Sequence, residues 1–567
     1  MRLDIFNRQI SSIHGAALII GAAGFLSRVL GLLRDRLLAS QFGASRELDI
    51  YYAAFQIPDF MTVLFLLGAG SAAILPIFQE YLGEDRKAAE KLISDLFTVF
   101  LAGSGIFALF AFFLAPFLAG IVAPGFSSDE LSIVTELTRI MLFAPILFGI
   151  SGIFTSVVES HQRFFAYALA PILYNVGIIS GIVFFVPLFG VLGLAFGVLS
   201  GAALHLGTHF VTVKNLGFAP RVSWSGISTG VKKVVALSFP RVLAVSFSQL
   251  TIFALVALGS TLAAGSIAVF QFAQNIYFIP IGIFGASYAV VLFPRLSRAY
   301  ISRDADTFFQ ELFLGIRSIL FWILPSIALF IVLRAHIVRV ALGAGAFSWE
   351  DTRLTAAVLA VLTVSLFANA IISLLIKGFY ALENTWAPLF INIAASLLSV
   401  ISALFFIRLL GGASPFGDFI ATRLRVSDLA DIRVLGLSLG LSLGFLVNVL
   451  LLYGALKRLT YRRFGERKKM PLRDLGKIVF SSLLAGIAAY LVRVSFSETL
   501  PLITFIRVLV QGIAAGGVGI LVYFSALFVL RESSARSLWQ TVRERMFKIR
   551  MLPASWNGEA HINQHRL

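Results

Sequence analysis

The chain has 567 residues, of which 58% are hydrophobic and only 13% charged, and its mean hydropathy is +0.91. Apolar runs of about 18 or more residues recur along the whole length, which excludes a soluble protein. The absence of Cys excludes disulfides, thiolate metal sites and a Cys nucleophile. The sequence also lacks a GxxxxGK(S/T) phosphate loop and any paired His motif, so neither ATP hydrolysis nor a metal or other cofactor is expected.

The apolar segments predict an all-α polytopic membrane protein of about 14 transmembrane helices. Several segments exceed the roughly 20 residues that a bilayer requires, so tilted or kinked helices are expected. Prolines inside the segments, among them Pro58, Pro171 and Pro325, supply the kinks. The predicted spans are residues 12–34, 48–78, 92–122, 131–157, 166–187, 189–212, 235–261, 267–294, 310–342, 352–377, 387–410, 432–456, 474–495 and 501–530.

Charge is distributed unevenly between the loops on the two sides of the predicted membrane. An even number of spans places both termini on one side, whose loops hold about 30 Lys and Arg against about 10 on the other side. The positive-inside rule therefore places both termini in the cytoplasm. Because the net charge of +17 follows from this topology, no nucleic-acid partner is expected. The basic loop and tail would instead attract anionic membrane lipids.

The two halves of the chain resemble each other at an offset of about 218 residues. One stretch matches Pro76 with Pro294, and a later one matches Pro171 with Pro388. Between them the loop sequence APGFSSDELS resembles GAGAFSWEDTRL. Each unit holds about six helices, so both enter the membrane in the same orientation, as parallel repeats. Two such bundles would enclose a central cleft that opens alternately to either side.

This repeat predicts the domain organisation. We expect an N-terminal six-helix bundle (1–213), a cytoplasmic connector (214–234), a C-terminal six-helix bundle (235–431, with its sixth helix at 432–456), a basic cytoplasmic loop (457–473), an additional helix pair (474–530) and a basic cytoplasmic tail (531–567). The longest external loop is 411–431, and the sequence indicates no role for it.

Two arginines and an aspartate lie in the first apolar segment, in the run SRVLGLLRD. An ionisable group at membrane depth costs on the order of 3 kcal/mol, so such groups usually face a watered cavity or a ligand. Arg28 and Arg34 are six residues apart, roughly 9 Å along a helix, and could line one wide cavity at two depths. The alternative is that Arg34 extends to the membrane interface and binds nothing.

Six motifs, taken in order, resemble one known family. They are SRVLGLLRD (27–35), LDIYYAAFQIPD (48–59), VAPGF (122–126), ALAPILYN (168–175), GAFSWEDT (345–352) and KGFYALENTWAP (377–388). Together they resemble the MurJ/MviN family of lipid II flippases, within the MOP exporter superfamily that also contains the MATE multidrug transporters. The resemblance spans about residues 10–530.

The resemblance implies a transporter and not an enzyme. Its expected function is to move lipid II, the undecaprenyl-diphosphate disaccharide-pentapeptide, from the inner to the outer leaflet of the bacterial inner membrane by alternating access. The expected partners are this lipid substrate, the surrounding membrane lipids and a coupling ion or the membrane potential. The protein is expected to act as a monomer, and its last helix pair to shape a groove for the polyprenyl tail.

The resemblance also implies a substrate-binding site. The two first-helix arginines of the family fall on Arg28 and Arg34, which are expected to bind the diphosphate because a guanidinium matches phosphate oxygens at any cellular pH. Asp35 is expected to orient an arginine. The acidic residue that opens the family's second helix falls on Asp49, for which capping and gating are both open.

Two further cavity arginines of the family are absent from this chain, where Thr62 and Asn275 occupy their positions. Fewer cations would hold a diphosphate less tightly. The chain is therefore either a divergent member that uses Arg28, Arg34 and polar groups, or a protein that handles a related lipid.

Other polar residues inside apolar segments have two interpretations each. Amides in the seventh and eighth spans either face the cleft or bond neighbouring helices. Asp59 either caps a helix or takes part in gating. One histidine pair is either a proton site or lies at the membrane interface, and its place near the cytoplasmic end favours the interface. Arg317 has no clear partner. The residues concerned are Gln249, Gln271, Gln274, Asn275, Asp59, His205 and His209.

Two alternative functions differ in substrate. A flippase for another polyprenyl-diphosphate glycan agrees with the missing arginines. A cation-coupled exporter of small amphiphilic molecules would require acidic residues in the helices, whereas the first charges expected to face the cleft are basic. A structural scaffold is disfavoured by the repeat with its intramembrane charges.

Overall fold

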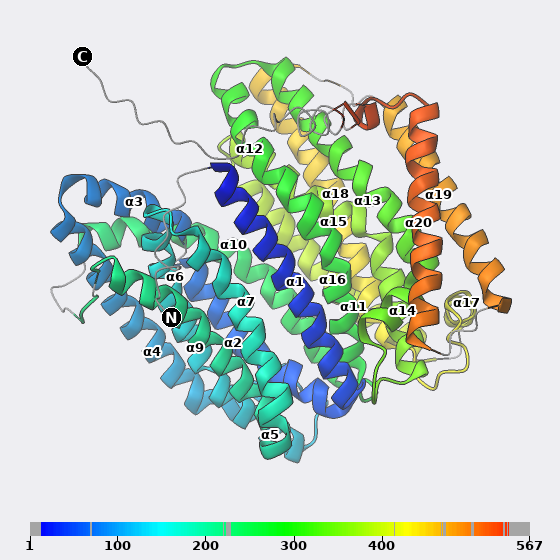
Figure 1. Cartoon of the computed structure of the whole chain (residues 1–567), viewed down its shortest axis with the longest axis horizontal. Coiled ribbons are helices and arrows are strands. Elements are labelled where there is room, and N and C mark those ends of the chain that lie inside the picture. The colour runs from blue at the N-terminus through cyan, green and yellow to red at the C-terminus, as the bar shows by residue number, and fades with distance from the viewer. Residues whose placement is uncertain are drawn as a thin grey trace, which may run out of the picture.

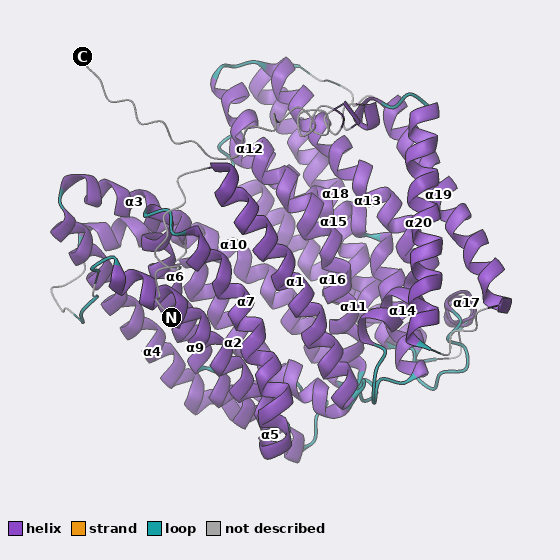
Figure 2. Cartoon of the chain, viewed as in Figure 1, coloured by secondary structure: helices purple, strands orange, loops and turns teal. Residues whose placement is uncertain are grey.

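The computed structural model describes residues 13–68, 71–218, 220–222, 228–412, 414–466, 468, 472–499, 504–536, 539–540 and 543. Within these residues the chain is helical and contains no strand (Figure 2). The predicted all-α class is therefore confirmed. Both ends of the chain lie outside the described residues, so the prediction that both termini are cytoplasmic stays a prediction. Part of the predicted connector also lies outside the described residues.

The helices form two lobes. The N-lobe consists of α2 (Arg46–Gly68), α3 (Ser71–Glu84), α4 (Arg86–Val122), α5 (Ser128–Met141), α6 (Phe143–Ser160), α7 (Phe164–Ser180), the π-helical turn η2 (Gly181–Phe185), α8 (Val186–Phe189) and α9 (Leu192–Asn215). The C-lobe consists of α11 (Ser266–Pro280), the π-helical turn η3 (Ile281–Gly285), α12 (Ala286–Ile301), α13 (Ala305–Leu342), α14 (Trp349–Val364), α15 (Leu366–Ala381), α16 (Trp386–Leu410), α17 (Pro415–Leu424) and α18 (Val434–Phe464).

Two long helices, α1 (Ile13–Phe42) and α10 (Thr229–Ser260), connect the lobes. α1 packs on α7 of the N-lobe and on α13 of the C-lobe, and it crosses the front of the molecule in Figure 1. α10 packs on α2 of the N-lobe and on α16 of the C-lobe. Any residue on the inner faces of these two helices is therefore placed between the lobes.

Fewer helices meet the length and hydropathy expected of a membrane span than the 14 that the sequence predicted. Ten helical stretches among the described residues are long and apolar enough to cross a membrane, or 11 if the bent pair α14 and α15 counts as one span. The predicted spans outside this count correspond to α1, to α2 with α3, and to α10. The structure thus confirms a polytopic helical fold, while the exact count of 14 is not confirmed.

The repeated loop signatures fold into the same local structure. Ser127 caps α5 and Ser348 caps α14, each in a capping box with the acidic residue three positions later, Glu130 or Asp351. A capping box satisfies two free backbone N–H groups of a helix end, so the sequence pattern alone sets where these helices begin. The match supports the duplication that the sequence indicated.

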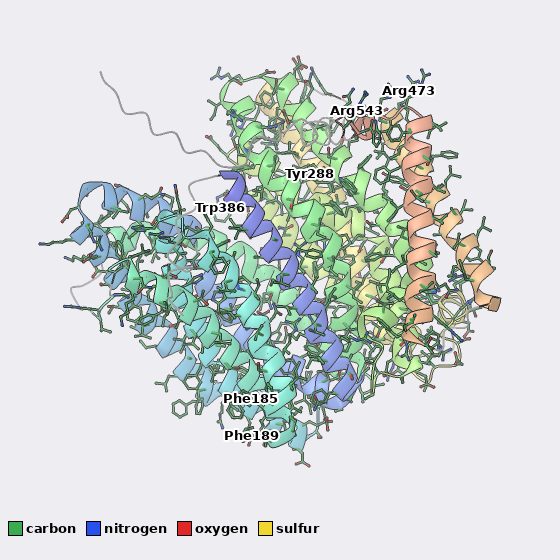
Figure 3. The ribbon with its side chains drawn as sticks, viewed as in Figure 1. Phe185, Phe189, Tyr288, Trp386, Arg473 and Arg543 are labelled. Carbon is green, nitrogen blue, oxygen red and sulfur yellow. The ribbon has the colours of Figure 1, made fainter. Side chains whose placement is uncertain are left out.

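The lobes meet at one end of the molecule. Arg473 and Arg543 lie at one end, called here the basic end, whereas Phe189 lies toward the opposite end (Figure 3). At that opposite end the Ala346 N–H donates to the Ser40 carbonyl at 2.8 Å, among other contacts between the halves. We call it the closed end, because the lobes diverge from it toward the basic end (Figure 1).

Large apolar side chains cover the outer faces of the helices. Phe110, Phe113 and Phe117 of α4 are each more than 60% exposed, and α20 (Phe505–Val529) presents Ile513 and Leu521 in the same way. Such surfaces are unfavourable in water and are expected where a helix faces lipid. The core of each lobe is formed by smaller apolar residues on the inner faces.

α19 (Leu472–Thr499) and α20 pack on α13 as a pair (Figure 1). Arg317 of α13 forms an ion pair of 3.2 Å with Asp474 at the start of α19, and its Nε lies 3.8 Å from Glu532, which follows α20. The Tyr523 hydroxyl donates to the Phe321 carbonyl at 2.5 Å. The interpretation that Arg317 has no clear partner is therefore wrong, because its partners come from a distant part of the sequence.

Candidate functional site

The charged pair of α1 lies between the lobes. Arg34 donates from Nε and Nη2 to Oδ1 of its neighbour Asp35, at 3.0 and 2.8 Å. The second oxygen of Asp35 accepts a 2.9 Å hydrogen bond from Nδ2 of Asn275, on α11. Asp35 is only 3% exposed, so its charge is satisfied by one cation and one amide instead of water. This contact ties α1 to the C-lobe.

A cavity of about 440 Å³, the central cavity, lies beside this pair, between α1, α2, α7, α10 and α11. Its volume is within the usual range of small-ligand sites. Both lobes contribute to its lining, which combines aromatic rings with amides and the charged groups Arg34 and Asp59. The lining residues are Arg34, Leu38, Tyr51, Tyr52, Phe55, Gln56, Asp59, Tyr174, Ile178, Ser248, Gln249, Ile252, Gln271, Gln274, Asn275 and Phe278.

The four amides that the sequence singled out all line the central cavity. Gln249 also donates from Nε2 to Asp59 at 2.7 Å, and so joins α10 to α2. Gln271 donates to Asn275 at 3.4 Å within α11. The Nε2 of Gln274 is buried and has no hydrogen-bond partner among the residues that the structure describes. Facing the cavity and bonding neighbouring helices are therefore not exclusive for these side chains.

Arg28 lies on α1 outside the central cavity and is exposed. Its neighbour Ser27 holds α1 against α7, because the Asn175 amide donates to the Ser27 hydroxyl at 3.3 Å. The guanidinium of Arg28 lies against the C-lobe, where a Cβ at Gly282 of η3 would be 2.9 Å from Nη2. Within the described residues no acidic side chain pairs with it. Arg28 is thus an uncommitted cation between the lobes, whereas Arg34 is paired with Asp35.

The two positions without family arginines lie in different places. Asn275 lines the central cavity and holds Asp35, as described above. Thr62 lines a second cavity of about 290 Å³ inside the N-lobe, the N-lobe cavity, and its hydroxyl donates to the Pro58 carbonyl at 2.9 Å. Asp59 and Tyr174 line both cavities.

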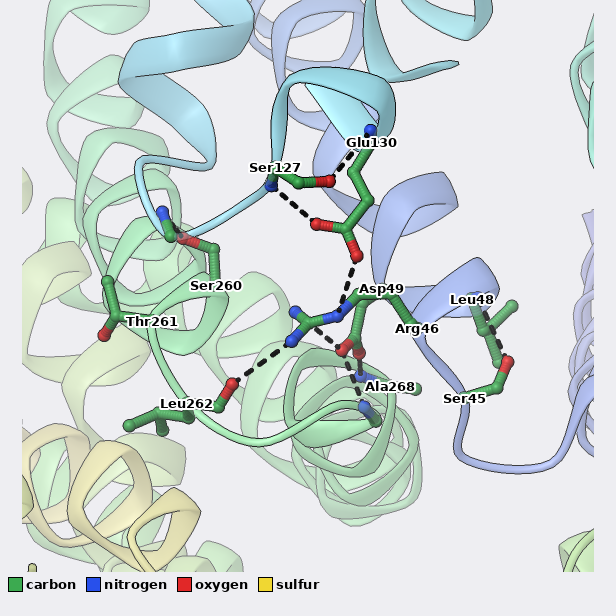
Figure 4. A network of polar contacts seen from close by, with 12 residues as sticks. Ser45, Arg46, Leu48, Asp49, Ser127, Glu130, Ser260, Thr261, Leu262 and Ala268 are labelled. Atoms are coloured by element: carbon green, nitrogen blue, oxygen red, sulfur yellow. Dashed lines mark hydrogen bonds and ion pairs between the residues drawn. The ribbon is translucent and has the colours of Figure 1, made fainter. Parts of the chain in front are cut away.

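Asp49 is not in either cavity but in the contact between the lobes at the closed end (Figure 4). Its carboxylate accepts hydrogen bonds from the backbone N–H groups of Gly265, at 2.7 Å, and Ala268, at 2.8 Å. Arg46 lies 3.7 Å from Asp49 and 3.3 Å from Glu130 (Figure 4). The structure therefore brings Arg34, Asp35 and Asn275 together and leaves Arg28, Asp49 and Thr62 apart from them.

Sequence reasoning missed the tyrosines of the site. Tyr51 and Tyr52 of α2 and Tyr174 of α7 line the central cavity. All three are in the quoted motifs LDIYYAAFQIPD and ALAPILYN. A hydroxyl-bearing ring inside an apolar segment needs a polar partner or water, and that signal could have marked these positions.

A family model described as lipid II flippase MurJ matches residues 38–511. The chain belongs to the MurJ family of lipid II flippases. One relative, the lipid II flippase MurJ of Burkholderia cenocepacia, is 27% identical over 452 residues, which cover 78% of this chain and 83% of that protein.

Two solved structures are similar to the whole fold. A lipid II flippase MurJ in an inward closed conformation matches with a TM-score of 0.71 and 25% identity, covering 90% of this chain and 98% of that one. An inward-facing multidrug resistance MATE transporter of the MOP superfamily matches with a TM-score of 0.61 and 14% identity, covering 80% and 100%. The second likeness concerns the fold alone. The expected MurJ family is confirmed, and the fold is shared with MATE transporters.

Proposed function

We propose that this protein translocates lipid II from the inner to the outer leaflet of the bacterial inner membrane by alternating access. The observation that carries the proposal is the uncommitted Arg28, which lies against the C-lobe in a member of the MurJ family. A guanidinium binds two phosphate oxygens at once, and the diphosphate of lipid II supplies them. Binding by Arg28 would draw the headgroup between the two lobes.

The proposed roles of the other site residues follow from diphosphate binding by Arg28. Arg34 is a second diphosphate ligand that becomes available when it leaves Asp35, and Asp35 keeps it oriented until then. Asn275 offers an amide to the headgroup from the C-lobe side. Thr62 supplies only a hydroxyl, inside the N-lobe. No covalent step is involved, so the protein is a transporter and not an enzyme. In this proposal it acts as a monomer and is driven by an ion gradient or the membrane potential.

The arrangement of the lobes supports an inward-facing state. With the basic end in the cytoplasm, as the positive-inside rule requires, the closed end faces outward. Asp49 then closes the outer side by bonding Gly265 and Ala268. Release of these bonds would accompany the change to the outward-facing state, and the proposed role of Asp49 is therefore gating.

A second candidate substrate is another polyprenyl-diphosphate glycan. It is favoured by the neutral side chains at Thr62 and Asn275, where the resemblance implies arginines. The diphosphate chemistry at Arg28 is the same for both lipids. The lipid-linked intermediate that accumulates when the protein is depleted distinguishes them.

The test is complementation of a strain depleted of its lipid II flippase. Arg28→Ala is expected to abolish growth and the appearance of lipid II in the outer leaflet at normal protein levels. Arg298→Ala is the matched control, because Arg298 is an exposed arginine whose guanidinium, among the residues that the structure describes, bonds only its own helix, at Pro294. Normal growth with Arg28→Ala at the wild-type protein level would contradict the proposal.

A further inference from the structure

Two histidines of α9 share one hydroxyl inside the N-lobe. The Nδ1 atoms of His205 and His209 each lie 2.8 Å from the Ser151 hydroxyl of α6. Their ring centroids are 5.1 Å apart. His209 is only 2% exposed, so its ring faces the protein interior. The transport steps proposed above use neither histidine.

The shared hydroxyl constrains the protons of the pair. A serine hydroxyl has one hydrogen, so it donates to one Nδ1 and accepts from the other. The Thr155 hydroxyl lies 3.3 Å from Nδ1 of His209, but it donates its own hydrogen to the Ser151 carbonyl at 2.8 Å. The two neutral rings therefore carry their protons on different nitrogens. If a proton is added, both Nδ1–H groups can donate to the two lone pairs of Ser151, and its own hydrogen turns away. The cluster can take up one proton without losing either contact.

The position of His205 decides which ring holds that proton. His205 lines the N-lobe cavity, whereas the Nε2 of His209 is buried and has no hydrogen-bond partner in the described part of the chain. A charge on His205 faces the cavity, while a charge on His209 would be buried without compensation. The added proton therefore belongs to His205.

The lining of the N-lobe cavity also includes one carboxylate. Among its lining residues Asp59 is the one carboxylate, and Tyr174 is the other titratable group. Of the other elements packed on α9, α6 contributes Ser151 and carries Glu159 near its C-terminal end. α7 also carries Tyr167 near its start, whereas η2 and α8 contain no ionisable side chain. The charged side chains of α5 are engaged elsewhere or exposed: Arg139 bonds the Phe112 carbonyl, Glu130 pairs with Arg46, and Asp129 and Glu136 are exposed.

Asp59 connects this cavity to the helix between the lobes. It lines the central cavity as well, and it accepts the 2.7 Å hydrogen bond from Gln249 of α10. A positive charge on His205 would attract the Asp59 carboxylate away from Gln249. Because α10 contacts both lobes, loss of that bond would weaken one connection between them.

We propose that the N-lobe cavity is a proton-binding site, in which His205 accepts the proton, Asp59 provides the counter-charge, and Ser151 with His209 holds the ring. The proposal deepens the proposed flippase function, on which its coupling role rests. A metal ion is not favoured, because no group of three or more His, Cys, Asp or Glu in the described residues could hold one. Occupancy of this site would couple a pH gradient to the contact between α2 and α10.

Protonation is measured directly in the purified full-length protein by NMR of labelled histidine rings, titrated from neutral pH downward through and below the ordinary imidazole range. We expect one resonance, absent from His205→Gln, to titrate in this series. Asp59→Asn should move its midpoint to lower pH. A His205 ring that stays neutral throughout, or an unchanged midpoint in Asp59→Asn, overturns the proposal. This readout does not depend on transport.

The coupling role is measured in proteoliposomes loaded with lipid II, with and without a pH gradient. The gradient should accelerate flipping by the wild type and have no such effect on His205→Gln. His336→Gln is the matched control, because His336 is a buried histidine bonded to Gln511 outside both cavities. If the pH gradient accelerates His205→Gln as much as the wild type, the coupling role is overturned. If the wild type flips no lipid II, the proposed function is contradicted, and the NMR titration alone decides whether the proton site exists.

Discussion

Asp49 caps a helix of the opposite lobe: its carboxylate accepts the backbone N–H of Ala268 at 2.8 Å, in the first turn of α11. Gly265, the residue before that helix, has no side chain with which to cap it and donates its own N–H to Asp49 at 2.7 Å. A capping carboxylate normally precedes its own helix. Here the cap comes from α2, so the start of α11 is satisfied only while the lobes are in contact.

Removing this cap should open the closed end. Asp49→Ala loses both hydrogen bonds, and a helix cap contributes about 1 kcal/mol, enough for roughly a fivefold change in a two-state equilibrium. The chain contains no Cys, so Ser260→Cys, at a position now 1% exposed beside Gly125, reports opening without background labelling. We expect faster maleimide labelling of Ser260→Cys when Asp49→Ala is added.

Asp129→Asn is the control for this measurement, because Asp129 is an exposed acid near the same end that makes no contact with α11 in the described residues. Equal labelling rates in the presence of Asp49 and of its alanine variant would show that the cap does not hold the lobes together.

A methyl group at Gly265 should act more strongly in the same direction. Gly265 has a φ of 85°, and a Cβ there would lie 2.0 Å from the Ala44 carbonyl oxygen of the other half of the chain. Neither the backbone strain nor the clash can be relieved while the lobes touch. We expect Gly265→Ala to raise labelling of Ser260→Cys above the Asp49→Ala level. Gly412→Ala, at an exposed glycine with open space around it, should leave labelling unchanged.

Asn275→Ala should destabilise the contact between α1 and α11. Asp35 would keep Arg34 but lose the 2.9 Å bond from Asn275, and a hydrogen bond to a charged group contributes about 1.5–3 kcal/mol. The expected result is a lower thermal unfolding temperature in detergent. Gln271→Ala removes only a 3.4 Å bond within one helix and should have a smaller effect. Equal losses in the two variants would argue against a tie between the lobes.

The helix pair α19 and α20 should detach when Arg317 is removed. Glu532 is fully buried, and leaving one partner of a buried ion pair alone costs about 3–5 kcal/mol. We expect Arg317→Ala to increase protease cleavage between α18 and α19. Adding Glu532→Gln removes the unpaired charge and should restore part of the protection, whereas no difference between the single and double variants would exclude the pairing.

Loop 411–431 should be held to α14 in a pH-dependent way. Arg353 donates to both oxygens of Asp428, at 2.9 and 2.6 Å, and these hydrogen bonds lower the pKa of the Asp428 carboxyl. A lowered pKa in the folded state means that the contribution is present above the ordinary Asp range and is lost as the pH falls through the lowered value.

Hydrogen exchange measures this dependence. We expect residues 426–432 to exchange faster at acidic pH, after correction for the intrinsic rate. Asp428→Asn should exchange faster already at neutral pH and show no further acidic step. An acidic step that persists in Asp428→Asn would assign the effect to another group.

Local properties of the sequence accounted for much of this molecule. Hydropathy predicted the helical segments, and the two capping boxes at Ser127 and Ser348 set the starts of equivalent helices. The amides inside apolar segments pointed to a polar interior, and Gln249, Gln271, Gln274 and Asn275 do line the central cavity. Such features are readable because burial of a polar group is costly wherever it lies along the chain.

The partner of each charge was not readable in this way. Arg317 meets Asp474, 157 residues later, and Asp49 meets Gly265 in the other half of the chain. Sequence spacing along a helix predicts a shared face but not what lies opposite that face. The resemblance grouped Arg28 with Arg34, yet the structure pairs Arg34 with Asp35 and leaves Arg28 uncommitted.

The sequence by itself determined that this chain is a bundle of apolar helices in two like halves with charges in the first helix, because hydrophobic transfer and helix capping act over a few residues. Only the tertiary structure decided which charges are neutralised, which helix end is capped from across the lobes, and where His205 and Asp59 face one cavity. These outcomes depend on segments some 145 to 240 residues apart in the sequence. Their relative position is set by packing of the two lobes and of α1 and α10 between them.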